Sequence, residues 1–305
     1  MFSFGNKFKI TLFGASHDQM VGVVVEGLKA GTTIDFDFIS DELKRRRPSK
    51  ENETKRIEED EFAFISGLEE GHTTEAALVI ALKNSNIKFE DYKDIKDVFR
   101  PGHADYSKFI KYNGFAYSTG GGIFSGRMTA PIVVAGAIAK KELAKDDIII
   151  KSKVINGEAN RTSVLEVRIS GLKPGIGEPF FDSLESKLSH MLFSIPSVKG
   201  VVFGDVLDTI DEDIKRDVYI LDGSPRTLYN HSGGIDGGIS NGEEIFFKVY
   251  LKPISSDIEK LKTLDKSMNE CEITMSGRHD KSIAGRVGVV LEAATAIVIY
   301  DELLR

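Results

Sequence analysis

Four of the six histidines lie in short polar segments that also contain glycine or charged residues. They are His17 in GASHD, His103 in RPGHAD, His231 in YNHSGG and His279 in GRHD. Imidazole gains and loses a proton near neutral pH, so histidine suits general acid and base catalysis. One histidine alone would more often be structural, but four in such segments predict an enzyme that moves protons.

Arginine is the second residue type with a chemical pattern. Arg100 precedes Pro-Gly-His, Arg278 precedes His-Asp, and Arg127 follows a triple glycine. Three more arginines stand together at 45–47, at the end of a short predicted helix, SDELKRRR, capped by Ser40. Three consecutive helical residues point in different directions, so at most two can reach one ligand, and a solvated face is the plain alternative. Because guanidinium groups bind phosphate and carboxylate through paired hydrogen bonds, the repeated arginines predict a pocket for a polyanion.

Two loops have the composition of a phosphate or cofactor site. The segment TGGGIFSGR (119–127) offers backbone N–H groups just before a predicted helix, where anions bind readily. The segment KPISSD (252–257) offers a lysine and two hydroxyl groups. Taken alone, the glycine cluster is better explained by tight turns, since glycine supplies the dihedral angles that turns need, and the segment 252–257 alone is a weak signal.

Composition limits the partners of the chain. Its 305 residues are 41% hydrophobic and 29% charged, which is ordinary for a globular protein, and the formal net charge of -7 disfavours nucleic acid and anionic membranes. Cys271 is the only cysteine, so no internal disulfide can form and no thiolate metal site is indicated; we expect no metal. The first residues lack the apolar run of a signal peptide and no apolar run could span a bilayer, so we expect a cytoplasmic protein.

Strand and helix patterns are mixed without regular alternation, which favours an α/β architecture with helices packed between or against sheets. Runs rich in β-branched and aromatic residues predict strands at 9–14, 21–28, 77–84, 147–154, 163–170, 200–206 and 244–251. Longer helices are predicted at 127–144, at 181–193 with Asp182 as N-cap, and at 285–304. The last of these is apolar on most sides and should therefore be buried. No dinucleotide fingerprint or Walker A segment is present.

Taken together, ten segments resemble the chorismate synthase family, in the family's order and from end to end. They are FGASHDQMVGVVVEGLKAG, RRRP, ISGLEEGHTT, RPGHADYSKFIKY, GGGIFSGRMTA, GIGEPFFDSLESKL, SIPSVKGVVFGD, NHSGGIDGGISNGE, LKPISS and GRHDKSIAGRVGVVLEAATAIVIYDELL. The resemblance implies a single chorismate synthase domain over 1–305, an α/β fold of the family's β-α-β sandwich type with helices packed between sheets, and a homotetramer. It also implies a lyase of the shikimate pathway, which leads to the aromatic amino acids. The family's reaction converts 5-enolpyruvylshikimate 3-phosphate to chorismate and phosphate by 1,4-anti elimination and requires reduced FMN.

Residue roles carry over from the matching motifs as expectations. The resemblance implies His17 as proton donor to the leaving phosphate, His103 beside the flavin ring, and Asp280 near flavin N5 as the group that relays the C6 proton. The implied substrate-binding residues are Arg46, Arg100, Arg127 and Arg278. The implied FMN contacts are Ser125, Pro196, Ser197, Gly237, Lys252, Pro253, Ile254, Ser255, Ser256 and Arg278. Arg46 also matches a position linked to NADPH, which is a possible reductant of the flavin.

The chain departs from the family pattern at several places. Ala15 and Asp18 replace a glutamate and a glycine beside His17, Met128 replaces a glutamate, and an arginine expected shortly after RRRP is missing. A family segment with a helix and an Asp-Ser-x-Gly-Gly stretch is predicted to be deleted near 160–163. These changes favour an alternative, a homologue that binds FMN and phosphate ligands but turns over poorly. An ordinary flavin oxidoreductase is a further alternative, and nothing in the chain indicates the nicotinamide domain it would need.

Overall fold

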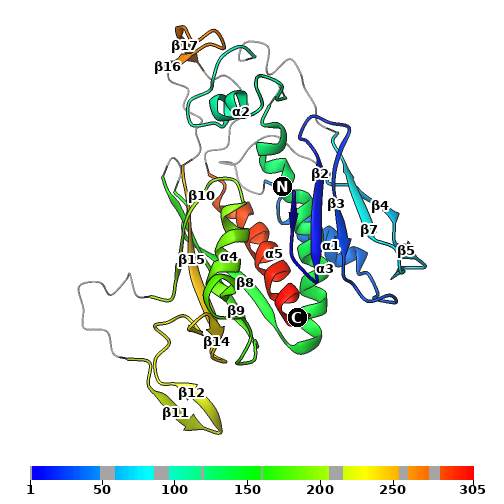
Figure 1. The fold of residues 1–305 in the computed structure, drawn as a ribbon, viewed down its shortest axis with the longest axis vertical. Coiled ribbons are helices and arrows are strands. Elements are labelled where there is room, and N and C mark those ends of the chain that lie inside the picture. Colours follow the sequence, from blue (N-terminus) through cyan, green and yellow to red (C-terminus); the bar gives the residue numbers. More distant parts are fainter. Residues whose placement is uncertain are drawn as a thin grey trace.

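The computed structural model describes residues 2–48, 59–85, 96–117, 120–158, 161–205, 216–253, 260–274 and 282–305. Two antiparallel sheets lie on the outside of the molecule, and the longest helices lie between them (Figure 1). This arrangement confirms the predicted β-α-β sandwich. The sheets bury alternate residues of their strands on the inner face, where the helices supply the other half of the core.

The first sheet has the strand order β1-β2-β3-β7-β4. Its strands are β1 (Ser3–Phe4), β2 (Lys9–Gly14), β3 (Met20–Glu26), β4 (Phe62–Ser66) and β7 (Leu78–Lys83). Strands β2 and β3 pair from Lys9↔Glu26 to Gly14↔Val21, so the loop between them is short and its ends are held together. That loop carries His17.

The second sheet has the order β10-β15-β9-β8. Its strands are β8 (Ile149–Asn156), β9 (Ser163–Ser170), β10 (Val198–Phe203) and β15 (Ile245–Leu251). The residues of β15 that the sequence places on one face, Ile245, Phe247, Val249 and Leu251, are all fully buried. The period of two in this strand therefore predicted its inner face correctly.

Two helices, α3 (Thr129–Leu143) and α5 (Ala284–Leu303), fill the space between the sheets (Figure 1). Both are apolar nearly all round and nearly all buried, as a helix enclosed on every side must be. They approach closely at Gly136, where an added Cβ would overlap Ala293. The helix α4 (Leu184–Phe193) packs beside α5 and β10, and α1 (Phe36–Lys44) packs against α3.

The remaining elements are short and lie around this core. They are α2 (Asp105–Lys111), β5 (Leu68–Glu69), β6 (His72–Thr73), β11 (Tyr219–Asp222), β12 (Ser224–Thr227), β13 (Ile235–Asp236), β14 (Ile239–Ser240), β16 (Lys260–Leu264) and β17 (Glu270–Thr274). In Figure 1, α2 and the β16–β17 hairpin lie at one end of the molecule, and the β11–β12 hairpin projects from the other.

Two predicted helix starts are wrong. Helix α1 begins at Phe36, and its N-cap is Asp35 and not Ser40, because the Asp35 carboxylate accepts a hydrogen bond from the Phe38 N–H. Helix α4 begins at Leu184 with Ser183 as its N-cap, and Asp182 belongs to a preceding 3-10 turn. Because α1 ends at Lys44, Arg46 and Arg47 lie in the turn that follows it and can point in directions that a helix would not allow.

Candidate active site

The motif residues meet at the end of the sandwich where α3 begins. Arg46 follows α1, His17 follows β2, and Ser125 and Arg127 immediately precede α3. A continuous series of contacts, described below, runs from Arg46 through Arg127 to the His17 loop. Segments that lie far apart in the sequence are therefore joined at this end of the fold.

Asp60 holds two of the predicted substrate-binding arginines. Its carboxylate accepts from Arg46 at 3.0 Å and also forms an ion pair with Arg127, and the Asp60 and Arg127 side chains are 3% and 5% exposed. Arg46 also donates to the Thr129 hydroxyl at 3.2 Å. Burial, together with the charges of Arg127 and Arg286, lowers the pKa of Arg46 to about 10, so this guanidinium stays protonated at neutral pH.

Among the described residues, the single carboxylate of Asp60 serves both Arg46 and Arg127, so this arginine pair has more positive than negative charge. The charges of Arg127 and Arg286 both act on the Arg46 guanidinium. Buried charge of one sign is costly unless a counter-charge is present. The cluster is therefore suited to bind an anion such as a phosphate or carboxylate.

Asn84 connects Arg127 to the His17 loop. Its side-chain oxygen accepts from Arg127 Nε at 2.9 Å, and its amide nitrogen donates to the carbonyls of Ala15 and Asp18 at 3.1 and 2.7 Å. Asn84 is 7% exposed, so these bonds are shielded from water. The amide fixes the loop on both sides of His17 and one arginine at the same time.

His17 is partly exposed and packs against a glycine. Its Nδ1 lies 2.9 Å from the hydroxyl of Ser16, a residue that is 1% exposed. The imidazole also lies against Gly120, which has a φ of +60°, and a Cβ at that position would overlap the ring. The hydroxyl and the glycine together hold the orientation of the ring, which a general acid requires.

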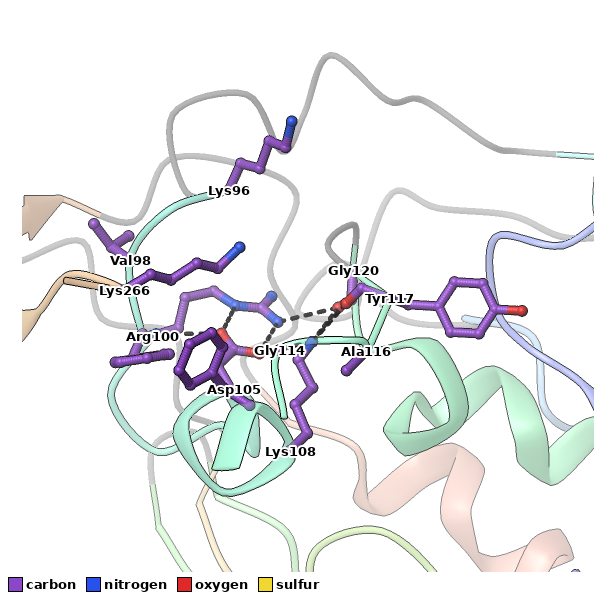
Figure 2. Close-up of a pocket in the computed structure, with 12 residues that line it drawn as sticks. Lys96, Val98, Arg100, Asp105, Lys108, Gly114, Ala116, Tyr117, Gly120 and Lys266 are labelled. Carbon is purple, nitrogen blue, oxygen red and sulfur yellow. Dashed lines mark hydrogen bonds and ion pairs between the residues drawn. The ribbon is translucent and has the colours of Figure 1, made fainter. Parts of the chain in front are cut away.

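Arg100 is turned toward a carboxylate. Its guanidinium donates to both oxygens of Asp105, at 2.6 and 3.0 Å, and Lys108 lies 3.2 Å from the same carboxylate (Figure 2). Burial raises the pKa of Asp105, but its hydrogen bond and ion pairs with Arg100 and Lys108 lower that pKa more strongly, to about 2. The carboxylate is therefore ionised throughout the neutral range. Arg100 also donates to the carbonyl of Gly120 at 3.4 Å, and Gly120 is the residue that packs against the His17 ring.

Several residues predicted to contact FMN lie together near His103. The Lys252 ammonium donates to the Gly102 carbonyl at 2.6 Å, and the Lys252 N–H donates to the Ser197 carbonyl at 2.9 Å. Pro196 and Pro253 are the neighbours of Ser197 and Lys252 in the chain, and the exposed His103 follows Gly102. A lysine, hydroxyl groups and backbone N–H groups make a donor set that fits a phosphate tail and ring oxygens.

Gly237 lies elsewhere within this chain. It belongs to the β13–β14 turn, and its neighbour Gly238 accepts a hydrogen bond from the first residue of α4, Leu184. Pro196 and Ser197 follow the other end of α4, a helix of 10 residues and thus roughly 15 Å long. The structure does not bring Gly237 together with the described members of the predicted cofactor set that lie near His103.

Two further observations complete the placement of the motif residues. His231 Nδ1 lies 2.9 Å from the Asp205 carboxylate, and its ring stacks on Tyr229, so it has a structural setting apart from His17. Five predicted site residues lie outside the described residues: Ile254, Ser255, Ser256, Arg278 and Asp280. Ser125 is placed, and its hydroxyl accepts from the Arg127 N–H at 3.2 Å.

Arg45, the first of the three consecutive arginines, belongs to a structural salt-bridge network and not to the site. Arg45 donates to Glu42 and Glu292 at 2.7 Å, and Lys140 joins the same two carboxylates. Burial raises the pKa of Glu292, but the hydrogen bond from Arg45 and the charge of Lys140 outweigh this effect and lower the pKa to about 2. This balanced network ties α1, α3 and α5 together, which leaves Arg46 as the member of the run that reaches the site.

Comparison with known proteins identifies the family. The chorismate synthase family model matches residues 8–162 and 160–304. The chain is 39% identical to the chorismate synthase of Chitinophaga pinensis, over 100% of this chain and 97% of that one, and 38% identical to the enzyme of Sulfurimonas denitrificans, over 100% and 96%. The chain belongs to the chorismate synthase family. A crystal structure of a chorismate synthase matches 99% of the chain with a TM-score of 0.75 at 21% identity, which shows the shared fold.

Membership of the chorismate synthase family carries the family's activity. The chain is a lyase that converts 5-enolpyruvylshikimate 3-phosphate to chorismate, a step of the shikimate pathway to the aromatic amino acids, and the family uses reduced FMN. The two matched ranges meet at residues 160–162, where a missing family segment is predicted; the deletion stays a prediction. No helix of the described chain is long and apolar enough to cross a membrane. Among the described residues no cluster of three or more potential metal ligands occurs.

Proposed function

We propose that His17 protonates the leaving phosphate while Arg46 and Arg127 hold it. The observation that supports this assignment is the Asn84 amide, which ties the His17 loop to Arg127 through three hydrogen bonds. A phosphate bound between the two arginines would gain paired, charge-assisted hydrogen bonds and would relieve their mutual repulsion. Protonation by a nearby imidazole would make it a better leaving group.

The remaining roles concern the substrate carboxylates and the cofactor. We propose that Arg100 and Arg278 bind substrate, that Asp280 accepts the C6 proton, and that His103, Lys252, Ser197 and Ser125 lie beside FMN. Reduced FMN, when bound, supplies electron density to the reaction and takes it back, so no net oxidation occurs. The Lys252 ammonium, already anchored on the Gly102 carbonyl, would place positive charge next to the cofactor phosphate.

The oligomer, the location and the domain organisation follow the family. We propose a homotetramer, a cytoplasmic location and one domain over 1–305. The position of Gly237, away from Lys252 in the same chain, supports an assembly in which its turn contacts a neighbouring copy. Light scattering of the purified protein would test the tetramer; a monomeric enzyme with full activity would contradict it.

Turnover should depend strictly on reduced FMN, which separates the active lyase from the alternative of a homologue that binds but turns over poorly. Chorismate and phosphate would be measured under anaerobic conditions with reduced FMN, oxidised FMN and no flavin. We expect product only with reduced FMN, because the reaction needs electron density that no described side chain can supply. Tight flavin binding without product would favour the alternative, and equal turnover in all three samples would contradict the flavin requirement.

Flavin reduction by NADPH should be weak or absent. Arg46 matches a position linked to NADPH, but the arginine expected shortly after RRRP is missing, and Arg46 is already bound to Asp60 and Thr129. We therefore propose that the cell supplies reduced flavin. Stopped-flow absorbance of bound FMN mixed with NADPH measures this directly. Bleaching at a rate that matches turnover would overturn the expectation.

A further inference from the structure

A second basic pocket lies on the other side of Gly120 from His17. It is formed by α2, the segment 96–100 before it, the loop that follows it and the turn between β16 and β17, and it is partly open to solvent (Figure 2). Four cationic side chains line it: Lys96, Arg100, Lys108 and Lys266. Asp105 is the only carboxylate among its described lining residues, so the pocket carries excess positive charge in a chain with net charge -7.

The contacts around Asp105 leave the described lining of the pocket with more positive than negative charge. Arg100 and Lys108 share its single carboxylate, and their side chains are 12% and 11% exposed. Among the described residues, Lys266 pairs with Asp97 at 3.6 Å, and the Asp97 side chain is 80% exposed and is therefore a weak partner. The rings of Phe99 and Phe109 contact each other and also line the pocket, which lowers the local dielectric and strengthens the attraction for an anion.

Gly120 connects this pocket to the catalytic loop. Its carbonyl accepts from Arg100 and Lys108, both at 3.4 Å, while the position of its missing Cβ faces the His17 ring. Gly120 alone therefore separates His17, the proposed proton donor to the leaving phosphate, from the second cluster of cations. The Tyr117 side chain points away from the pocket, toward the His17 loop, where its hydroxyl donates to Asp18 at 2.9 Å (Figure 2).

We propose that this pocket, which adjoins the substrate site through Arg100, is an anion site that receives the inorganic phosphate released by the reaction. The inference rests on the family activity, which produces phosphate beside His17 under the proposed mechanism. A doubly charged phosphate fits four cations and one carboxylate by charge, and the exposed Lys96 and the partly exposed Lys266 leave it a path to solvent. The pocket would keep phosphate from rebinding between Arg46 and Arg127, where the next substrate must enter.

The direct test measures binding of inorganic phosphate to the flavin-loaded protein by ³¹P NMR. The pocket variant is the double substitution Lys96→Ala and Lys266→Ala, neither of which belongs to the proposed catalytic or substrate-binding set. Lys260→Ala with Lys262→Ala is the matched control, since both residues are exposed, lie on the same hairpin and are outside the pocket. We expect the pocket variant to bind phosphate at least about tenfold more weakly than the control, because two nearby unit charges are lost.

Kinetics and flavin binding show whether the pocket binds inorganic phosphate or the phosphate group of FMN. With the intact protein, added phosphate should inhibit with a component that excess substrate does not reverse, and the pocket variant should lose that component. Flavin affinity, followed by fluorescence, should not change. Equal phosphate binding by the pocket variant and the control overturns the proposal, even where turnover is normal. Weaker flavin binding with unchanged phosphate binding would overturn it too, by assigning the pocket to the cofactor phosphate.

Discussion

Replacing His17 with alanine is expected to lower turnover by roughly 10²–10⁴-fold while the protein stays folded and binds FMN. The ring is held by the Ser16 hydroxyl and by Gly120 but is partly exposed, so its removal leaves a surface gap and not a hole in the core. If His17 donates the proton to the leaving phosphate, the loss should fall on kcat, since ground-state binding by the arginines is intact. Anaerobic steady-state kinetics with reduced FMN give both constants.

His72→Ala is the matched control for this substitution. His72 is exposed, and its Nδ1 lies 2.9 Å from the Glu70 carbonyl, far from any proposed step. We expect wild-type rates from it. Added imidazole should restore part of the activity of His17→Ala, because a free imidazole can enter the partly exposed site and donate the proton. A folded His17→Ala enzyme with activity within a few-fold of wild type would remove His17 from the catalytic role.

Asp60→Asn is expected to lower the free energy of unfolding by about 3–5 kcal/mol, since it leaves two buried guanidinium groups without their carboxylate. Arg46 and Arg127 would repel each other, and kcat/KM should fall because their positions are no longer fixed. The stability would be measured by urea unfolding followed by circular dichroism. Inorganic phosphate should restore part of the lost stability, because an anion bound between the arginines replaces the missing charge.

Asp41→Asn is the control for charge removal. Asp41 pairs with Lys44 at 2.8 Å on the exposed face of α1, and such surface pairs contribute only about 0–1 kcal/mol. A similar small effect from both variants would mean that Asp60 does not neutralise the arginine pair. A large loss of stability that phosphate fails to reduce would mean that Asp60 supports the fold without preparing an anion site.

The core elements could be predicted from the sequence because their patterns are strong and local. Helices α3 and α5 are apolar on nearly every side, and β15 alternates over its whole length. The β16–β17 hairpin was not predicted, since each strand is only five residues long and its exposed face carries lysines or glutamates. Helix α2 was missed as well, because it is seven residues long and lies within a motif that was interpreted chemically.

Only those residues of the candidate site that lie in a recognisable motif could be predicted from the sequence. His17, Arg46 and Arg127 lie in recognisable segments, and the structure joins them. Asp60 and Asn84 were missed because nothing local marks them: Asp60 follows a run of charged residues and Asn84 follows a strand. Their partner Arg127 is 67 and 43 residues away in the sequence, so their importance appears only when the chain is folded.

The order in which the layers of the sandwich are synthesised has a consequence for the nascent chain. Every strand of both sheets precedes α5 in the sequence. Until α5 is added, the inner face of the second sheet and the side of α3 that α5 contacts are uncovered. At about 5–20 residues per second, the part between Leu143 and Leu303 takes about 10–30 s to leave the ribosome. During that time apolar inner faces stay open to solvent. We therefore expect the growing polypeptide to require chaperones, and a premature stop anywhere before α5 to yield an aggregating product and not a smaller enzyme.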